Sequence, residues 1–529
     1  MRYKLKSAAA MLSAVVFALL APGIASRTAG ESPIKTAEPV QTAVETVTET
    51  AVPASAPATT TVTTVEPEFT LTVTTLDSEE LVKLSEDKKK EEKKKTKKET
   101  TTTAPEEPEP EETTTKKKKK KTTTTTITTA PEEIPPEEEE PEEEEEQTPV
   151  ESSESQRGDS RISGDRLNYM QQKAMWVTCM TLSELMSGGG EQNFRNNFST
   201  LCQNAKDLGI NTLYVHTRAF SDAFYKSDLF VWSRWITGSS GKDPGYDPLA
   251  VMVELGHQYG LSVHAWINPY RVDKPDNIAA MPDCTIRQWY SYPGLYPEYM
   301  TYVDSTGWVW LNPGIPEVRQ LINNGVAEIV SRYDVDGVNI DDYFYPTTDA
   351  SFDDSAYLKY GDGMSLKEWR FYNCSETVRG MYNTVKAYDP SVQFGVAPGG
   401  NVEVNYYSQY ADVERWVSEP GFLDYIAPQI YFGYSNQYRP FLSTLSQWLN
   451  MPRHSGASMY IGIAPANIML VSEYSSTSNI IAKQIHDSYS YGADGVALYS
   501  YSSLFMPESG YEGKLADERA AITTELGYY

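Results

Sequence analysis

Short apolar segments alternate with amphipathic stretches of helical length from residue 174 onward, and this alternation constrains the fold more than any other feature of the chain. Eight strands and intervening helices predict an α/β fold, a closed parallel (β/α)8 TIM barrel. A doubly wound open sheet, which usually has fewer strands, is the alternative. The strands are predicted at 174–180, 212–217, 262–268, 337–343, 393–398, 425–431, 459–464 and 495–501, and the helices near 194–208, 248–259, 317–332, 366–387, 409–417, 440–449 and 479–490.

Five of the predicted strands divide in the same way, with aliphatic side chains on one face and aromatic or polar side chains on the other. Strand side chains alternate between faces, so the aliphatic set suits packing against helices and the other set points into the barrel. Burying many polar groups without partners would cost roughly 1–3 kcal/mol each. A hydrated, ligand-binding mouth at the C-terminal end of the barrel, where active sites of this fold lie, is therefore predicted.

The aromatic and polar set also indicates the kind of ligand. Trp, Tyr, Asn, Gln, Asp and His offer stacking faces and planar hydrogen-bonding groups, which suit sugar rings. The predicted substrate-binding residues are Arg218, His264, Trp266, Asn268, Arg271, Asn339, Gln429, Tyr431 and Tyr501.

The segment 333–346 is the strongest local motif, because it places two adjacent carboxylates at the end of the fourth strand. Asp341 shares the interior face with Asn339 and is predicted to be catalytic, since a carboxylate inside a barrel requires a reason to be there. Asp342 has the opposite parity, but it sits where strand gives way to loop. It is predicted to be catalytic as well, and the alternative is that it braces the loop.

Several longer motifs resemble the glycosyl hydrolase-like 10 family. They occur in order at 232–249, 264–271, 312–319, 336–346 and 427–431. The similarity extends from about residue 174 to residue 504. It implies a TIM barrel with glycosidase-type activity, and for some members of the family a bacterial cell-wall glycan as the substrate.

The fourth strand is also similar to the chitinase-type pattern Asp-Gly-x-Asp-x-Asp-x-Glu. Its positions fall on Asp336, Asn339, Asp341 and Tyr343, so a tyrosine stands where the chitinase pattern has its acidic glutamate. The chitinase mechanism therefore does not transfer. Glycoside hydrolysis usually needs two carboxyl groups, one as acid and one as nucleophile or base. Besides Asp342, candidates for the second are Asp222, Asp273, Asp304, Glu403 and Glu473.

The N-terminal part of the chain has a different texture. A basic start, an apolar run over 8–20 and small residues before position 26 predict a signal peptide over 1–25. The apolar run is short for a membrane span, so no stable span is expected after cleavage, although an uncleaved anchor is the competing interpretation. Residues 26–165, rich in Thr, Pro, Glu and Lys, predict a disordered linker before a barrel domain over 166–529. The protein is expected to be secreted or cell-wall associated, in a bacterium.

Composition narrows the remaining possibilities. A net charge of -27 argues against nucleic acid as a partner, and polysaccharide or peptidoglycan glycan strands are expected instead. The four cysteines are not closely paired, so buried free thiols are favoured over a disulfide framework. No cofactor or metal is predicted. Two alternatives remain, a non-catalytic glycan-binding barrel and a metal-assisted sugar deacetylase in which His216 and His264 share a metal with Asp341.

Overall fold

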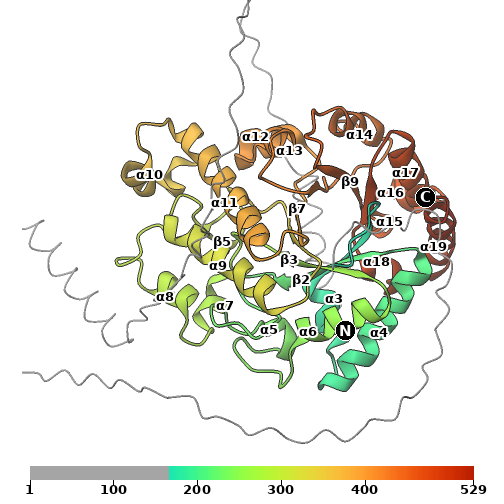
Figure 1. The fold of residues 1–529 in the computed structure, drawn as a ribbon, viewed down its shortest axis with the longest axis horizontal. Helices are drawn as coiled ribbons and strands as arrows, with labels where there is room; N and C mark the ends of the chain where they lie inside the picture. The colour runs from blue at the N-terminus through green and yellow to red at the C-terminus, as the bar shows by residue number, and fades with distance from the viewer. Residues whose placement is uncertain (1–165) are drawn as a thin grey trace, which may run out of the picture.

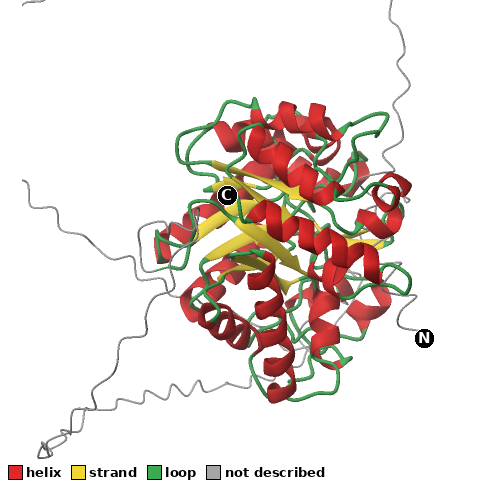
Figure 2. Ribbon diagram, turned by 90° about the vertical axis from the view of Figure 1, so that its right-hand side faces the viewer, coloured by secondary structure: helices red, strands yellow, loops and turns green. Residues whose placement is uncertain are grey.

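The computed structural model describes residues 166–529, and the predicted signal peptide and linker lie outside the described residues. Eight parallel strands close into a barrel in the order β1-β10-β9-β8-β7-β6-β3-β2, surrounded by helices (Figure 1, Figure 2). The predicted TIM barrel is thus confirmed. Its strands are β1 (Lys173–Val177), β2 (Thr212–Arg218), β3 (Ser262–Ile267), β6 (Gly337–Ile340), β7 (Gln393–Val396), β8 (Tyr425–Ile426), β9 (Ser458–Ile463) and β10 (Gly495–Leu498).

Longer helices connect the strands and pack against one another around the barrel. They are α4 (Glu191–Leu208), α6 (Pro248–Gln258), α9 (Pro316–Arg332), α11 (Leu366–Tyr388), α14 (Phe441–Leu449), α17 (Ile480–Ser490) and α19 (Glu512–Leu526). Shorter helices lie in the loops: α3 (Cys179–Leu185), α5 (Arg234–Thr237), α7 (Pro275–Ala279), α8 (Thr285–Ser291), α10 (Asp354–Tyr360), α12 (Val402–Gln409), α13 (Val413–Ser418), α15 (Asn467–Leu470), α16 (Ser472–Ser476) and α18 (Tyr501–Phe505). Within 166–529, no helix has the length and apolar character needed to cross a membrane.

The structure departs from the predicted elements at several boundaries. The predicted strand 425–431 is reduced to β8, because Pro428 has no N–H to donate to a ladder. The predicted helix 409–417 begins later, as α13 at Val413. Tyr410, which adopts a left-handed conformation with φ 54°, ends the preceding helix α12, which was not predicted. An antiparallel hairpin, β4 (Met300–Val303) with β5 (Trp308–Leu311), and the helix α19 were not predicted.

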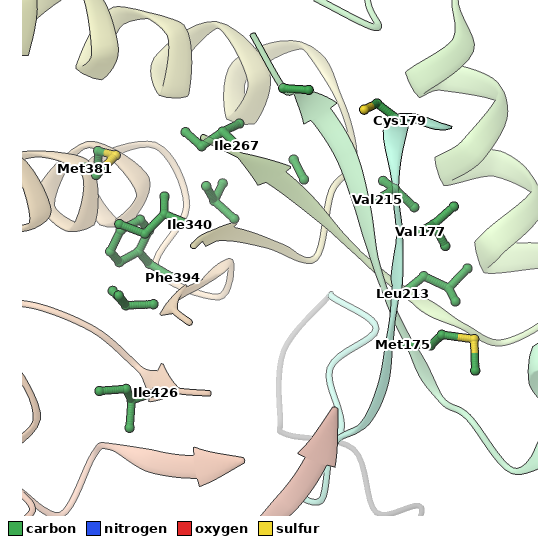
Figure 3. Close-up of a cluster of buried hydrophobic side chains, with 14 of the residues drawn as sticks. Met175, Val177, Cys179, Leu213, Val215, Ile267, Ile340, Met381, Phe394 and Ile426 are labelled. Carbon is green, nitrogen blue, oxygen red and sulfur yellow. The ribbon is translucent and has the colours of Figure 1, made fainter. Parts of the chain in front are cut away.

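Two cores follow from the alternation of side chains along the strands. Aliphatic residues such as Leu213, Val215 and Ile340 point outward and pack against the helices, as Figure 3 shows together with Met381 of α11. A separate buried cluster fills the barrel interior. It consists of Ala174, Trp176, Tyr214, Trp266, Ala397, Tyr425, Ala427, Tyr431, Tyr460, Ala464, Ala466, Ala497 and Tyr499.

The N-terminal end of the barrel is closed by the segment that precedes β1. Gln172 accepts a hydrogen bond from the hydroxyl of Tyr214 (2.6 Å) and donates to Gln393 (2.7 Å). Asn168 donates to the backbone carbonyl of Asp336 (2.9 Å). Asn168, Gln172 and Tyr214 in the lower half of the barrel therefore find partners inside the protein rather than in water.

All four cysteines lie within the described part of the chain, and none of them is in a disulfide. Cys179, Cys202 and Cys374 are buried, whereas Cys284 is half-buried. The prediction of free thiols is confirmed, although one of them is not fully buried.

The inner packing predicts a large effect at Gly395 of β7. A Cβ at this position would overlap the ring of Tyr425, because the two residues are paired on neighbouring strands. We expect Gly395→Ala to lower the free energy of unfolding by roughly 1–3 kcal/mol, since overpacking a dense core forces neighbours to move. Urea denaturation followed by circular dichroism measures the change. Gly513→Ala is the control, because a Cβ there meets nothing within 4 Å; equal stability of the two variants would contradict the expectation.

Candidate active site

Asp341 and Asp342 form a carboxyl pair directly after β6, at the C-terminal end of the barrel. Asp341 is only 3% exposed, and its Oδ2 accepts a hydrogen bond from the amide of Asn268. Asp342 is half-buried and faces the loop after β7. A Cβ atom added to Gly399 of that loop would lie 3.9 Å from Oδ2 of Asp342. The two carboxyls therefore face different walls of one site.

The pair is electrostatically coupled. Burial raises the pKa of Asp341 well above its ordinary value, and the neighbouring charge of Asp342 raises it further, whereas Arg271 and Asn268 act in the opposite direction. Burial also raises the pKa of Asp342, opposed by a hydrogen bond from Gln429 and by Arg271. Adjacent buried carboxyls of this kind favour a state in which one is protonated and the other ionised.

Arg271, from the loop after β3, supplies the positive charge next to the pair. Its guanidinium lies 4.0 Å from the ring centroid of Tyr343 and 4.6 Å from that of Phe220. One nitrogen of the same group donates to Asn268 Oδ1 (3.0 Å). The aromatic faces and this hydrogen bond hold the cation in place with little help from water.

A chain of hydrogen bonds orients Asn268. The backbone N–H of Cys179 donates to His216 Nδ1 (3.1 Å), so the proton of the neutral ring lies on Nε2, which donates to Asn268 Oδ1 (2.7 Å). The amide nitrogen is thereby directed at Asp341. Burial lowers the pKa of His216 to about 3, and the ring stacks on Trp266 with centroids 3.5 Å apart. His216 therefore stays neutral and acts on Asp341 through Asn268.

The opposite wall of the site comes from β8 and β10. Tyr431 is 3% exposed and its ring lies 5.5 Å from that of Tyr499. Burial raises the pKa of the Tyr431 hydroxyl well above its ordinary value, and the negative charges of Tyr499, Asp342 and Asp341 raise it further. The hydroxyl of Tyr431 therefore lies near the carboxyl pair. Gln429, half-buried, also bonds Asp342.

The structure brings most of the predicted site residues together at this end of the barrel. Buried polar atoms without a hydrogen-bond partner also meet there, among residues 166–529: Asp341 Oδ1, Arg271 Nε and the hydroxyl of Tyr431. Such atoms are costly unless a ligand or water satisfies them. The predicted residues that meet here are Asp341, Asp342, Trp266, Asn268, Arg271, Gln429 and Tyr431.

Arg218 does not lie in the site, contrary to the prediction. A bulge in β2 pairs His216 with Trp266 but Arg218 with Ile267, so the alternation of faces is broken between them. Arg218 consequently points outward, over the ring of Phe230 at 4.7 Å.

His264 and Asn339 have interior side chains, as predicted, but lie deeper than the carboxyl pair. His264 Nε2 bonds Asn168 (3.1 Å), and its Nδ1 bonds the hydroxyl of Tyr425 (2.8 Å), which also accepts from Asn339 (3.2 Å). Both residues are fully buried. The structure therefore places His264 and Asn339 in the network that closes the lower barrel, away from the carboxyl pair.

Tyr501 also lies outside the barrel. β10 ends at Leu498 and α18 begins at Tyr501, so the strand alternation does not extend to this residue. Its hydroxyl accepts a hydrogen bond from Asn204 of α4 (2.8 Å). Tyr499, directly after the end of β10, is the residue that reaches the site.

Four residues of the site were not among the predicted site residues. His216 has the same strand parity as Arg218, and Tyr499 the same as Tyr501, so strand alternation is a signal that could have found both. Phe220 and Trp308 carry no such signal, because a loop and the unpredicted hairpin bring them together with ring centroids 5.4 Å apart. Only the tertiary structure reveals them.

The loop carboxylates considered as a second catalytic group have partners of their own. Asp222 accepts a hydrogen bond from the backbone N–H of Phe220 (3.0 Å), and Asp273 forms an ion pair with Arg234 (3.0 Å). Glu403 forms an ion pair with Arg439, and Glu473 accepts a hydrogen bond from the hydroxyl of Ser435 (2.7 Å). Asp304 is exposed to solvent. Among these candidates, Asp342 is the one that the structure couples to Asp341.

The donor arrangement does not fit the shared metal of the deacetylase alternative. Both ring nitrogens of His216 and of His264 are engaged in hydrogen bonds, and the two rings belong to different networks. Within residues 166–529, no three His, Cys, Asp or Glu side chains are arranged to hold a metal ion.

The chain is similar to several known proteins. A family model described as Glycosyl hydrolase-like 10 matches residues 171–477. The glycosyl hydrolase DigH of Escherichia coli (strain K12) is 38% identical over 278 residues, covering 49% of this chain and 62% of DigH. The glycosyl hydrolase YngK of Bacillus subtilis (strain 168) is 34% identical over 320 residues, covering 56% of this chain and 61% of YngK. The matched region thus spans about three fifths of these relatives.

Two solved structures are also similar. The glycoside hydrolase domain of PgaB (BpsB) from Bordetella bronchiseptica has a TM-score of 0.44 and 12% identity, covering 66% of this chain and 99% of that one. The catalytic domain of β-amylase from Paenibacillus polymyxa has a TM-score of 0.44 and 12% identity, covering 67% of this chain and 98% of that one.

The raised pKa of Asp341 predicts a cost to stability. The carboxyl of Asp341 binds a proton more tightly in the folded protein than in the unfolded chain. The stability that this proton contributes is therefore fully present below about pH 4 and is lost as the pH rises through the pKa of the folded state. The side chain in Asp341→Asn cannot ionise. We expect the melting temperature of this variant to be roughly 2–4 °C or more above that of the wild type at pH 7, and close to that of the wild type at about pH 4. Differential scanning calorimetry at both pH values measures this. The exposed Asp304→Asn serves as control, and a lower melting temperature for Asp341→Asn at pH 7 would contradict the interpretation.

Proposed function

The chain belongs to the glycosyl hydrolase-like 10 family, and from this premise we propose that it is a secreted glycoside hydrolase. Its proposed substrate is a polysaccharide, specifically the glycan strands of bacterial peptidoglycan, and its catalytic groups are Asp341 and Asp342. The predicted signal peptide and linker support a secreted or cell-wall associated location.

The observation that carries the proposal is the coupled carboxyl pair beside Arg271, in which Asp341 is buried and Asp342 half-buried. Asp341, whose pKa is raised by burial and by its neighbour, is suited to hold a proton at neutral pH and to give it to the glycosidic oxygen. Asp342, half-buried and bonded by Gln429, is suited to be the ionised partner that activates water or stabilises positive charge on the sugar.

The remaining walls suit a sugar ring. Tyr431 and Tyr499 provide aromatic faces on one side of the pair, and Trp308, which stacks on the buried ring of Phe220, on the other. Unpartnered polar atoms on Arg271 and Tyr431 are available to hydroxyl groups of a substrate. Pyranose rings, which are apolar on their faces and polar at their edges, match this combination.

A non-catalytic glycan-binding barrel is the second candidate. Two observations favour it: Asp341 is only 3% exposed, and Tyr343 occupies the place of the glutamate in the chitinase-type pattern. Under this alternative the same aromatic walls would hold a glycan without cleaving it.

Hydrolysis of defined glycans tests the proposal. The full chain, incubated with peptide-free peptidoglycan strands, is expected to release new reducing ends and shorter fragments detectable by mass spectrometry. Asp341→Asn is expected to lose about 10²–10⁴-fold in kcat, because positioned acid–base groups contribute on that order. Asp304→Asn, an exposed carboxylate on the β4–β5 hairpin, is the matched control and should retain full activity. Binding of the strands by the wild type without any release of fragments would overturn the enzymatic proposal in favour of the glycan-binding one.

The pH dependence tests the role of Asp341. A general acid must be protonated, so kcat/KM is expected to fall as pH rises through the pKa of Asp341. Arg271 holds that pKa below the level that burial and Asp342 would otherwise set. Removing this charge in Arg271→Met should therefore shift the alkaline limb of the kcat/KM profile to higher pH. Lys359→Met, which removes an exposed positive charge on α10, should leave the limb in place. A shift to lower pH in Arg271→Met would exclude Asp341 as the acid.

A further inference from the structure

A cluster of aromatic side chains outside the catalytic site lies on α11 and α12; we call it the rim surface, made of Phe371, Tyr406 and Tyr407. The ring centroids of Phe371 and Tyr406 are 4.5 Å apart, and those of Tyr406 and Tyr407 are 5.0 Å apart. The Nζ of Lys367 lies 4.9 Å from the Tyr406 ring and 5.4 Å from the Tyr407 ring. Three rings and one cation thus share a single surface.

The rim surface lies on a helix that begins close to the carboxyl pair. α12 follows the loop after β7, and Gly399 of that loop is the residue that faces Asp342. The indole N–H of Trp448 donates to the carbonyl of Gly400 (2.8 Å), which anchors the loop. From the N-cap of α12 to Tyr407 is six residues, or about 9 Å at the helical rise of 1.5 Å per residue.

One ring of the rim surface, that of Tyr407, is largely exposed, and the other two are partly accessible. Tyr407 is 61% exposed, and Phe371 and Tyr406 are half-buried. Clustered, exposed aromatic side chains mark interaction surfaces. The faces of tyrosine and phenylalanine suit the apolar faces of pyranose rings, and the ammonium of Lys367 suits a carboxylate on the same ligand.

A second aromatic group lies on the other side of the carboxyl pair. The ring centroid of Phe220 is 6.0 Å from that of Trp235 and 5.4 Å from that of Trp308. In the barrel, β6 with its carboxyl pair stands between β3 and β7. Figure 1 accordingly shows α5, which carries Trp235, and α12 on opposite sides of the barrel strands.

We infer that the rim surface is a distal binding site for the same glycan chain whose bond lies at Asp341, an inference that rests on the proposed function. A chain held by Trp235 and Trp308 on one side and by the rim surface on the other passes over the carboxyl pair with sugar units bound in both directions. The protein then binds within long carbohydrate strands rather than at their ends, and the carboxylates of peptide-free peptidoglycan strands meet Lys367.

Binding to strands of different length tests the inference in the full chain carrying Asp341→Asn, which separates binding from cleavage. Adding Tyr406→Ala and Tyr407→Ala is expected to weaken binding of long peptide-free strands about tenfold in isothermal titration calorimetry, since two stacking contacts amount to about that factor. Binding of a disaccharide fragment should change less than twofold. Tyr388→Ala is the matched control: this tyrosine is 56% exposed at the far end of α11 and should alter neither affinity. Melting temperatures confirm that each variant is folded, and Tyr407→Ala alone provides a milder variant.

The possible results separate the two proposals. Unchanged affinity for long strands in the double variant would overturn the rim surface while leaving the hydrolase proposal intact. Equal loss for long strands and disaccharide would also overturn it, because a distal site cannot affect a ligand that does not reach it. Failure of the parent Asp341→Asn chain to bind any strand, together with no hydrolysis by the wild type, would overturn the proposed function as well. Self-association that is lost in Tyr407→Ala, with glycan binding unchanged, would assign the surface to a second copy of the chain instead.

Discussion

Polar side chains inside a closed parallel barrel must find partners within the protein, and this requirement organises the whole structure. At the N-terminal end the partners come from the segment before β1, where Asn168 and Gln172 complete the hydrogen bonds of His264 and Tyr214. At the C-terminal end, unpartnered atoms of Asp341, Arg271 and Tyr431 meet instead. The barrel therefore joins its own polar side chains at one end and carries the carboxyl pair at the other.

The reactive end depends on a balance of opposing effects on one carboxyl. Burial and Asp342 disfavour the charged form of Asp341, whereas Arg271 and Asn268 favour it. The position of Asn268 is in turn set by His216, whose neutral ring bonds the backbone of Cys179 on the other side. A buried neutral histidine in this place is a positioning residue. It controls the hydrogen bond to Asp341 without titrating near neutral pH.

The loops after the strands extend the surface beyond the carboxyl pair. The β2 loop and the β4–β5 hairpin bring Phe220 and Trp308 together, and the loop after β7 leads into α12 and its exposed tyrosines. These aromatic groups stand on both sides of β6. A rigid barrel with variable loops can in this way fix the reacting groups while the loops determine how much of a long ligand is held.

The division between sequence and tertiary structure is clear in individual residues. Alternation along each strand is a local property, so the sequence by itself determined the eight strands, the outward aliphatic set and the interior positions of Trp266, Asn268, Asp341 and Tyr431. Local periodicity carries no information about depth, register or strand ends. Pairing between β2 and β3 creates the bulge that turns Arg218 outward, the segment before β1 encloses His264, and the end of β10 removes Tyr501 from the interior. Those positions were decided only by contacts between distant parts of the chain, because a side chain's neighbours in a barrel come from other strands.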